Sequence, residues 1–272
     1  MSTTTKVSAT ANPDLANQLA AEAIKQDVVS TGSIREKVDT PPDTSVELAA
    51  GLLDPFRGLI TTAEVRELNG ADEEAISKAS DAGKALLTIL DRAVVKLGDE
   101  PATKEDLSML LAGDRELLLL AIRRVTFGDE VNLEGEICPK CPESQQMIIN
   151  LNKDVKIKKL ESDRVFTVKC KVGLVEVMLP NGVTQKELVN ATTKTAAELD
   201  TVVLKSCVKS INGITVIDSE QVKLLSIKDR REILKAISDR NPGPQLSEVS
   251  KPCKFCGSEV PLPMTLADLF QE

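Results

Sequence analysis

Two pairs of cysteines constrain the fold of this chain more than any other feature. Each pair has the spacing CxxC, with Cys138 and Cys141 in the middle of the chain and Cys253 and Cys256 near its end. Two cysteines separated by two residues lie in a tight turn that directs both sulfurs to one point, and two such turns supply the four thiolates of a tetrahedral Zn²⁺ site. Because four sulfurs leave no coordination position for water or substrate, we expect a structural zinc whose binding energy stabilises the fold.

The alternatives for these cysteines are two disulfides or two redox-active CxxC motifs. The N-terminus lacks the basic and apolar regions of a secretory signal, and no run approaches the roughly 20 apolar residues of a membrane span. We therefore expect a protein that is made in a cytoplasm and has no membrane span. Thiols stay reduced in a cytoplasm, which favours metal binding over disulfides.

The composition excludes several classes of function. The chain of 272 residues contains no His, no Trp and no Tyr, and its formal net charge is −8. Without histidine there is no Ser-His-Asp triad, no His-activated cysteine and no HExxH zinc site. The missing Trp and Tyr and the acidic balance argue against nucleic-acid binding. An enzyme would rely on Asp, Glu, Lys or Cys alone, and nothing places two carboxylates across a pocket. We predict a protein that is not an enzyme and has no small-molecule substrate.

The chain divides into an extension and a core domain at about residue 56. Residues 1–56 are rich in Ser, Thr, Ala, Asp and Pro, which predicts an N-terminal extension that buries no core by itself. Within it, residues 14–29 predict a short helix with Leu15 and Leu19 on one side, so the extension is either flexible or docks on a partner. Residues 57–272 are predicted to form the core domain, with the cysteine hooks at 138–141 and 253–257.

Apolar residues at three- and four-residue spacing predict the helices. These cover residues 82–97, 103–111, 115–125, 195–210 and 226–239, and one more helix begins near Asp72. Gly113 is expected to end one helix and Asp114 to cap the next. A catalytic pair of Asp114 with Arg115 is the alternative, but an N-cap and an ion pair are the expectation at such positions.

Alternating apolar residues predict strands over 59–68, 146–151, 155–160 and 165–179, with a bulge or bend at Gly173. Cys170 falls on the apolar face of the last strand and Cys207 on the apolar face of the helix over 195–210, so both are predicted to be core side chains and not reactive thiols. The strands also carry the basic residues Lys153, Lys156, Lys158, Lys159, Arg164, Lys169 and Lys171. They could contact nucleic acid, but basic residues alternating with apolar ones are typical of the solvent face of a sheet.

The predicted fold class is α+β: helical segments with a small antiparallel β region and a split zinc-ribbon-like site of four cysteines. Each hook precedes a short strand, which is the layout of a zinc ribbon, and the strand after the second hook includes Val260 and Leu262. Everything between residues 142 and 252 would then be an insertion between the halves of the ribbon. The metal would hold the C-terminus against the middle of the chain.

Several segments of the core together resemble the baseplate hub family of tailed bacteriophages. They are VRELNGADEEA at 65–75, LLAGDRELLLLAIRRVTFGDE at 110–130, the CxxC directly downstream, VMLPNGV at 177–183, and the terminal CxxCG with LADLF at 266–270. The resemblance covers about residues 59–272, and the GDR segment and the paired hooks are its more specific elements. One departure is Pro142, where such knuckles commonly have Gly, which affects the fine geometry of the first hook but not its ligands.

The resemblance implies a structural, non-catalytic component of the hub region of a contractile-type tail baseplate. Such a protein would be made in the host cytoplasm, bind other tail and baseplate proteins in a hetero-oligomeric assembly and be located in the virion. Some members of the family are incorporated at the centre of the baseplate, and others are described as hub assembly factors. The alternatives are therefore a hub assembly chaperone that the virion does not retain, or a zinc-ribbon nucleic-acid-binding accessory protein, which the acidic balance opposes.

Overall fold

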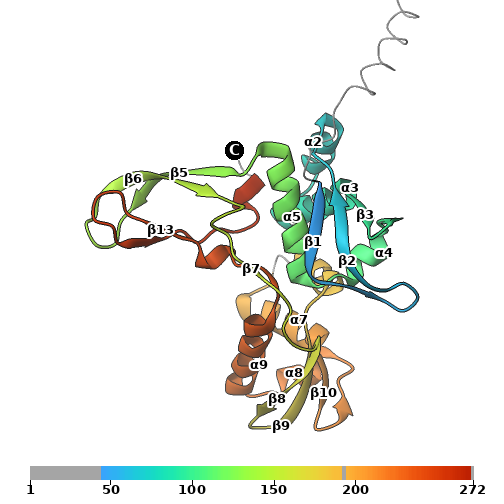
Figure 1. The fold of residues 1–272 in the computed structure, drawn as a ribbon. Coiled ribbons are helices and arrows are strands. Elements are labelled where there is room, and N and C mark those ends of the chain that lie inside the picture. Colours follow the sequence, from blue (N-terminus) through green and yellow to red (C-terminus); the bar gives the residue numbers. More distant parts are fainter. Residues whose placement is uncertain (1–43, 192–193, 271–272) are drawn as a thin grey trace, which may run out of the picture. The chain divides into compact units, whose positions relative to one another are not determined.

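The protein is an α+β protein, as the sequence predicts (Figure 1). A computed structural model describes residues 44–191 and 194–270. The helix predicted over residues 14–29 lies outside the described residues. Three apolar clusters form the core of the described part, and each belongs mainly to one of the three regions described below. Among the described residues, no helix combines the length and the apolarity that crossing a bilayer requires.

The first region, module 1, comprises residues 45–127. Its elements are β1 (Ser45–Asp54), β2 (Gly58–Val65), α2 (Gly70–Ile76), α3 (Ala82–Ala93), β3 (Val94–Leu97), β4 (Glu100–Pro101), α4 (Lys104–Met109) and α5 (Ala112–Phe127). The strands form an antiparallel sheet in the order β1-β2-β3-β4. The helices α3 and α5 pack on this sheet and bury side chains such as Leu90, Leu118 and Ile122.

Strand β1 lies in the stretch that the composition assigns to the N-terminal extension. It pairs along its length with β2 and buries Val46, Leu48 and Leu52 in the core of module 1. The stretch SVELAAGLLD is apolar enough for a core strand, but the Ser-, Thr- and Pro-rich residues before it hide this in a composition average. The core therefore includes residues well before the predicted boundary at 56.

The helix predicted over 82–97 is shorter in the structure. Helix α3 ends at Ala93, and Val94–Leu97 form β3, in which Val94 pairs with Val65 of β2. Adjacent β-branched residues, here Val94 and Val95, favour a strand once a partner strand is available. The sheet decides the conformation of a segment whose apolar spacing fits either structure.

The two helices predicted to meet at Gly113 and Asp114 are present, but the break between them lies at Leu110 and Leu111. Helix α5 begins at Ala112 with Leu111 as N-cap, so Gly113 and Asp114 lie in its first turn. Gly113 is needed for packing, since a Cβ atom there would lie 1.7 Å from the main-chain oxygen of Pro242. Asp114 does not cap α5. Its Oδ1 accepts hydrogen bonds from the main-chain N–H groups of Ala49 and Ala50 in β1, at 2.6 and 3.0 Å.

The second region, the hook region, is built from two stretches of chain, residues 130–158 and 243–270. Its elements are β5 (Glu130–Ile137), β6 (Ser144–Asn150), β7 (Ile157–Lys158), β12 (Gly243–Pro244), the 3-10 turn η1 (Leu246–Glu248), β13 (Ser250–Pro252), β14 (Glu259–Pro261) and the 3-10 turn η2 (Asp268–Phe270). The first hook is the turn of the β5–β6 hairpin and the second is the turn of the β13–β14 hairpin. The strands after the hooks were predicted from the sequence, whereas β5 and β13 were not.

The third region, module 2, comprises residues 165–240 and is inserted between the two halves of the hook region, as the split-ribbon prediction requires. Its elements are β8 (Val165–Cys170), β9 (Gly173–Met178), α6 (Gly182–Val189), α7 (Ala196–Cys207), β10 (Val208–Ile211), β11 (Ile214–Thr215), α8 (Ser219–Lys223) and α9 (Ile227–Arg240). The strand predicted over 165–179 is a hairpin that turns just before Gly173. The helix predicted over 195–210 ends at Cys207, and Val208–Ile211 join the sheet.

Modules 1 and 2 have the same order of elements and the same sheet. Each consists of a hairpin, two helices, a second hairpin and two helices, and the strand orders are β1-β2-β3-β4 and β8-β9-β10-β11. Asn69 and Asn181 cap the first helix of each module, in both cases directly before a Gly at its first position. In both modules the second helix runs without a loop into the third strand, at Val94 and Val208.

A buried Asp followed directly by an Arg also recurs in both modules, as Asp114-Arg115 and Asp229-Arg230. Asp229 at the start of α9 accepts a hydrogen bond from the main-chain N–H of Lys171 after β8, as Asp114 does from β1. Arg115 donates to the carbonyl of Leu107, and Arg230 donates to the carbonyl of Val222, eight residues earlier in each case. The chain thus contains two copies of one module, a repeat that was not predicted from the sequence.

Candidate metal centre

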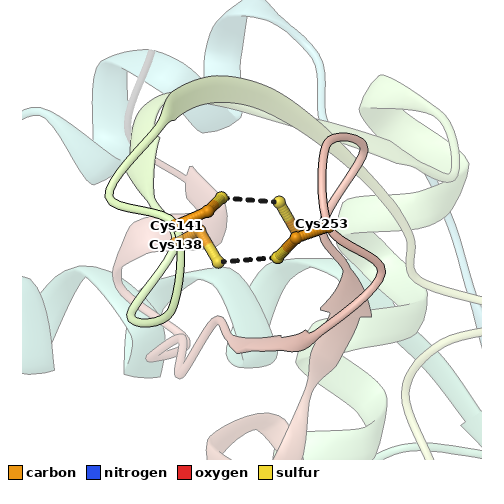
Figure 2. Close-up of side chains that lie close together, drawn as sticks. Cys138, Cys141 and Cys253 are labelled. Atoms are coloured by element: carbon orange, nitrogen blue, oxygen red, sulfur yellow. Dashed lines mark hydrogen bonds between the residues drawn. The ribbon is translucent and has the colours of Figure 1, made fainter.

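The four hook cysteines lie together in the folded chain. The sulfur atoms of Cys138, Cys141, Cys253 and Cys256 all lie within 4.8 Å of one another. The Sγ atoms of Cys138 and Cys256 are 3.7 Å apart, and those of Cys141 and Cys253 are 3.6 Å apart. Figure 2 shows that the side chains of the two hooks point toward each other across this gap. Residues more than 110 positions apart therefore meet at one point.

The spacing of the sulfurs fits a tetrahedral metal ion. Zinc–sulfur bonds of about 2.3 Å in a tetrahedron place neighbouring sulfurs about 3.8 Å apart. The separations of 3.7 and 3.6 Å between the hooks are close to this value, and all four sulfurs lie within 4.8 Å of one another. An ion held by all four thiolates would have no open position for a substrate. The arrangement can hold a metal for structure and offers no site for catalysis by it.

Main-chain hydrogen bonds fix the turn of each hook and thereby the positions of its sulfur atoms. The N–H of Cys138 donates to the carbonyl of Glu143, and the N–H of Cys253 donates to the carbonyl of Ser258. Within each turn, the N–H of Lys140 points at the sulfur of Cys138 and the N–H of Phe255 at that of Cys253, both at 3.4 Å. Such N–H groups stabilise thiolate charge, because they place positive dipole ends next to the sulfur.

Gln145 connects the two hooks and was not predicted as a site residue. Its side chain is buried at the start of β6, where Nε2 donates to the Cys253 sulfur at 3.2 Å and Oε1 accepts from the N–H of Lys254 at 3.0 Å. Groups that orient metal ligands in this way raise metal affinity. The one signal in the sequence was a polar residue at an inward-facing position of a strand in which Met147 and Ile149 are buried.

The two hooks differ at the residue after their second cysteine. Gly257 follows Cys256 with φ +72°, which glycine adopts without strain, and Pro142 follows Cys141 with φ +20°. A proline ring favours φ near about −65°. The irregularity expected at Pro142 is therefore present in the first hook, while its two sulfurs keep their place in the cluster.

The thiols influence one another's protonation. Burial opposes ionisation of Cys253, but the N–H groups of Cys256 and Phe255 and the Gln145 amide outweigh it and lower the pKa of Cys253 to about 6. At Cys141 the N–H of Glu143 favours the thiolate, yet burial and the other three sulfurs raise the pKa of Cys141 to about 12. Four thiolates so close together repel each other, so full ionisation requires a cation among them.

The cluster of cysteines joins segments that are distant in sequence. Buried side chains around it come from β6, β14 and α5, among them Ile149, Val260 and Leu120. The C-terminal turn η2 also contacts α5, where Arg123 Nε donates to the carbonyl of Leu269 at 2.6 Å. A metal in the hooks would hold the C-terminal segment against the middle of the chain, as expected from the sequence.

The other two cysteines are buried, as predicted. Cys207 is fully buried, and burial raises the pKa of its thiol to about 12. Cys170 lies within 4.8 Å of a carboxylate oxygen of Asp229 and of Glu232, and burial together with these two charges raises the pKa of its thiol. No charged neighbour for Cys170 was evident from the sequence. These carboxylates make it less reactive as a nucleophile, because they disfavour the thiolate.

Asp114 and Arg115 bind different groups and do not form a catalytic pair. Asp114 holds β1, and burial raises the pKa of its carboxyl above the usual range. Arg115 is buried against module 2, where its Nε donates to Oε1 of Gln185 at 2.6 Å. Both residues connect segments of the fold, so contacts to other elements replace the ion pair that was expected between them.

Several of the basic residues considered for nucleic-acid binding contact protein groups. Lys158 donates to the carbonyl of Asp239, Lys159 forms an ion pair with Glu47, and Arg164 donates to the carbonyls of Ala50 and Gly51. Lys158 thus contacts module 2, and Lys159 and Arg164 contact β1 of module 1. This arrangement weakens the case for a continuous basic surface.

The fold and the site define a class: an α+β protein with two related modules and a four-cysteine cluster that can hold a structural metal. The family model of the T4 bacteriophage base plate proteins matches residues 59–271. The chain belongs to this family. No curated protein and no solved structure matches the chain.

Proposed function

We propose that this protein is a structural, non-catalytic component of the hub region of a tailed-phage baseplate. Membership of the base plate protein family over residues 59–271 carries the proposal. The missing histidine and the closed donor set of the four-cysteine cluster support it, because a protein that acts by surfaces needs neither a proton shuttle nor an open metal position. Its partners are other tail and baseplate proteins, and its place is the virion tail.

We also infer that the ion in the four-cysteine cluster is zinc, bound by Cys138, Cys141, Cys253 and Cys256. Four cysteine sulfurs within 4.8 Å of one another favour zinc as a structural metal, and zinc in such a closed site supplies folding energy. The chain's own contribution is to aim the sulfurs with main-chain N–H groups and Gln145, and to tie the two hairpins into one cluster.

The functional proposal is tested by deleting the gene from its phage. Each baseplate needs its structural subunits in fixed numbers. Cells infected with the deletion phage should therefore make tail components that do not join into complete baseplates. Sedimentation and electron microscopy of the lysate measure this. A deletion phage that still builds infectious tails would show that the proposal is wrong.

Membership of the family is compatible with either a retained subunit or an assembly chaperone. Mass spectrometry of purified virions, compared with an immature assembly fraction, separates the two. Presence in both fractions supports a subunit of the hub. Presence in the immature fraction alone identifies a chaperone that the virion does not retain.

The nucleic-acid alternative makes a different prediction. It requires binding of DNA or RNA at moderate salt that weakens steeply as salt rises. Replacing Lys156, Lys158 and Lys159 by Glu would then abolish the binding. We expect no such binding by the wild-type chain, and a fluorescence anisotropy titration with single- and double-stranded oligonucleotides checks this.

The zinc assignment predicts about one Zn²⁺ per chain by elemental analysis. Cys253→Ser should release the metal and lower the melting temperature, because the remaining thiols cannot close the tetrahedron. Cys207→Ala is the control: it should keep the metal and lose only core packing, worth about 1 kcal/mol. Full metal retention in Cys253→Ser would contradict the assignment.

A further inference from the structure

Module 2 shows how long the first hairpin of the module needs to be. Its strands β8 and β9 turn directly after Cys170, with Cys170 paired to Gly173. In module 1 the corresponding strands go on: β1 continues to Asp54, and β2 begins correspondingly earlier, at Gly58. The two hairpins can be aligned through their sheets. Val65 of β2 pairs with Val94 of β3, and Val177 of β9 pairs with Val208 of β10, so Val65 and Val177 occupy equivalent positions. The outer part of the β1–β2 hairpin is thus an addition relative to module 2. Its inner side chains Leu52 and Ile60 are buried in the core of module 1, and the tip beyond them places its apolar side chains in solvent.

This added hairpin tip is apolar and exposed. Leu53 and Leu59 are directly paired across the hairpin and are 61% and 58% exposed, and Phe56 in the turn is 97% exposed. Figure 1 shows the loop between β1 and β2 extending away from the rest of its sheet. Phe56 is one of only five aromatic residues in the chain. We name Leu53, Phe56 and Leu59 the hairpin knob.

The turn that carries Phe56 is braced. Asp54 Oδ1 accepts hydrogen bonds from the N–H groups of Phe56 and Arg57, both at 2.8 Å. The Arg57 guanidinium binds the Asp54 carboxylate at 3.0 Å and also pairs with Asp106 at the start of α4. These contacts fix the main chain of the turn that presents the Phe56 ring, which lowers the entropy that docking would cost.

The surroundings of the hairpin knob are acidic. A hollow of about 530 Å³ beside it is lined by Arg57, Glu100, Pro101, Thr103 and Asp106. The charge of Arg57 is matched by Asp54 and Asp106, and that of Lys104 by Asp91. Glu100 and the exposed Glu105 therefore leave a net negative rim. Anionic lipid head groups would be repelled by this rim, whereas Lys or Arg side chains of a protein would be attracted.

We propose that the hairpin knob is a docking element that inserts Phe56 into an apolar pocket, rimmed by basic side chains, on another protein of the baseplate. The proposal rests on the proposed function. A single aromatic anchor in a desolvated pocket commonly dominates the energy of such an interface. The acidic rim supplies the specificity, and its contacts make binding weaker at higher salt.

The test uses the full chain and a phage that lacks its gene. A photo-reactive phenylalanine analogue replaces Phe56 in cells infected with the deletion phage, and cross-linked products are identified by mass spectrometry. We expect a cross-link from position 56 to one tail protein. Leu224, which is 88% exposed after α8 in module 2, is the control position and should not give the same product.

The second measurement is incorporation into baseplate-sized complexes after adding purified chain to the same lysate. Phe56→Ser should require about thirty-fold more protein for half-maximal incorporation, as expected for the loss of a central anchor. Leu224→Ser should behave as wild type. Phe56→Leu, which keeps an apolar side chain, should recover most of the loss, and all variants should melt at the wild-type temperature because position 56 is solvated.

The outcomes separate the two proposals. If the wild-type chain enters no baseplate complex, the proposed function fails, and the docking proposal fails with it. If the wild type enters and Phe56→Ser enters equally well, the docking proposal alone is overturned. A cross-link from position 56 only to lipid, or only to a second copy of this chain, also overturns it.

Discussion

At the scale of single residues, burial changes the protonation of carboxyl groups inside this protein. Glu116 illustrates this: it lies half-buried in α5 and lines a hollow of about 240 Å³ together with Asn241, Gln245 and Ser247. Burial raises the pKa of its carboxyl to about 7 from an ordinary value of 4.5. The folded state therefore holds the proton over a pH range in which the unfolded chain has lost it.

The pKa of Glu116 predicts a pH dependence of stability. A raised folded-state pKa gives stability that is complete below pH 4.5 and is lost as the pH rises through about 7. Glu116→Gln should remove this loss and stabilise the protein at pH 8 by about 1 kcal/mol, a value reduced because the side chain is partly solvated. Urea titrations of both proteins at pH 5 and pH 8 measure the difference. Equal losses of stability between the two pH values would contradict the prediction.

At the scale of elements, α5 is the helix on which the other segments depend. Its start contacts β1 through Asp114, module 2 through Arg115, and the segment before β12 through Gly113. Its later turns contribute to the core of module 1 and, through Leu120, to the hook region. Helix α5 thus packs against all three regions of the described chain.

The packing of α5 makes a prediction about two glycines. In Gly113→Ala the new Cβ would meet the main-chain oxygen of Pro242 at 1.7 Å, and main-chain atoms cannot move aside without shifting the segment. We expect a loss of about 3 kcal/mol in unfolding free energy. Gly70→Ala is the matched control: it also lies at a helix start but meets nothing within 4 Å, so its effect should stay within about 0.5 kcal/mol. Denaturant midpoints of the two variants compare these costs, and similar values would contradict the packing argument.

At the scale of the whole molecule, two copies of one module are joined by the hook region. Module 2 interrupts the hook region, so the loop that the two cysteine hooks close is more than 110 residues long, and folding of the chain between them lowers the entropy cost of closing it. The four-cysteine cluster is therefore formed by long-range contacts, and its metal affinity depends on the fold. We expect removal of the metal to loosen β5, β6, β13 and β14 before either module.

The position of β1 predicts where the chain can be shortened. A chain that begins at Asp43 keeps β1, whereas one that begins at Arg57 loses it and exposes its partners Ile60 and Ala63 in β2. The first should melt cooperatively, and the second should aggregate or melt without cooperativity, because an unpaired apolar strand edge is left. Calorimetry and size-exclusion chromatography check this. Equal stability of the two chains would restore the predicted boundary at residue 56.

The sequence by itself determined the features that depend on neighbouring residues. The CxxC spacing indicated two turns with paired sulfurs, and the caps at Thr103 and Ser226 marked the starts of α4 and α9. The apolar spacing located α3, α5, α7 and α9, and the apolar faces on which Cys170 and Cys207 fall pointed to buried thiols. Each of these signals acts over a few residues, so it can be read without knowing the partners.

Only the tertiary structure decided which partner each segment has. Val94–Leu97 and Val208–Ile211 fit a helix or a strand equally well by spacing, and they became strands because β2 and β9 offered hydrogen-bonding edges. Gly113 and Asp114 read locally as a stop and a cap, yet the close approach of Pro242 and the N–H groups of β1 placed them inside α5. The physical reason is that main-chain and carboxylate groups satisfy their hydrogen bonds with whichever partner the fold brings near, and for Asp114 that partner lies 65 residues away in the chain.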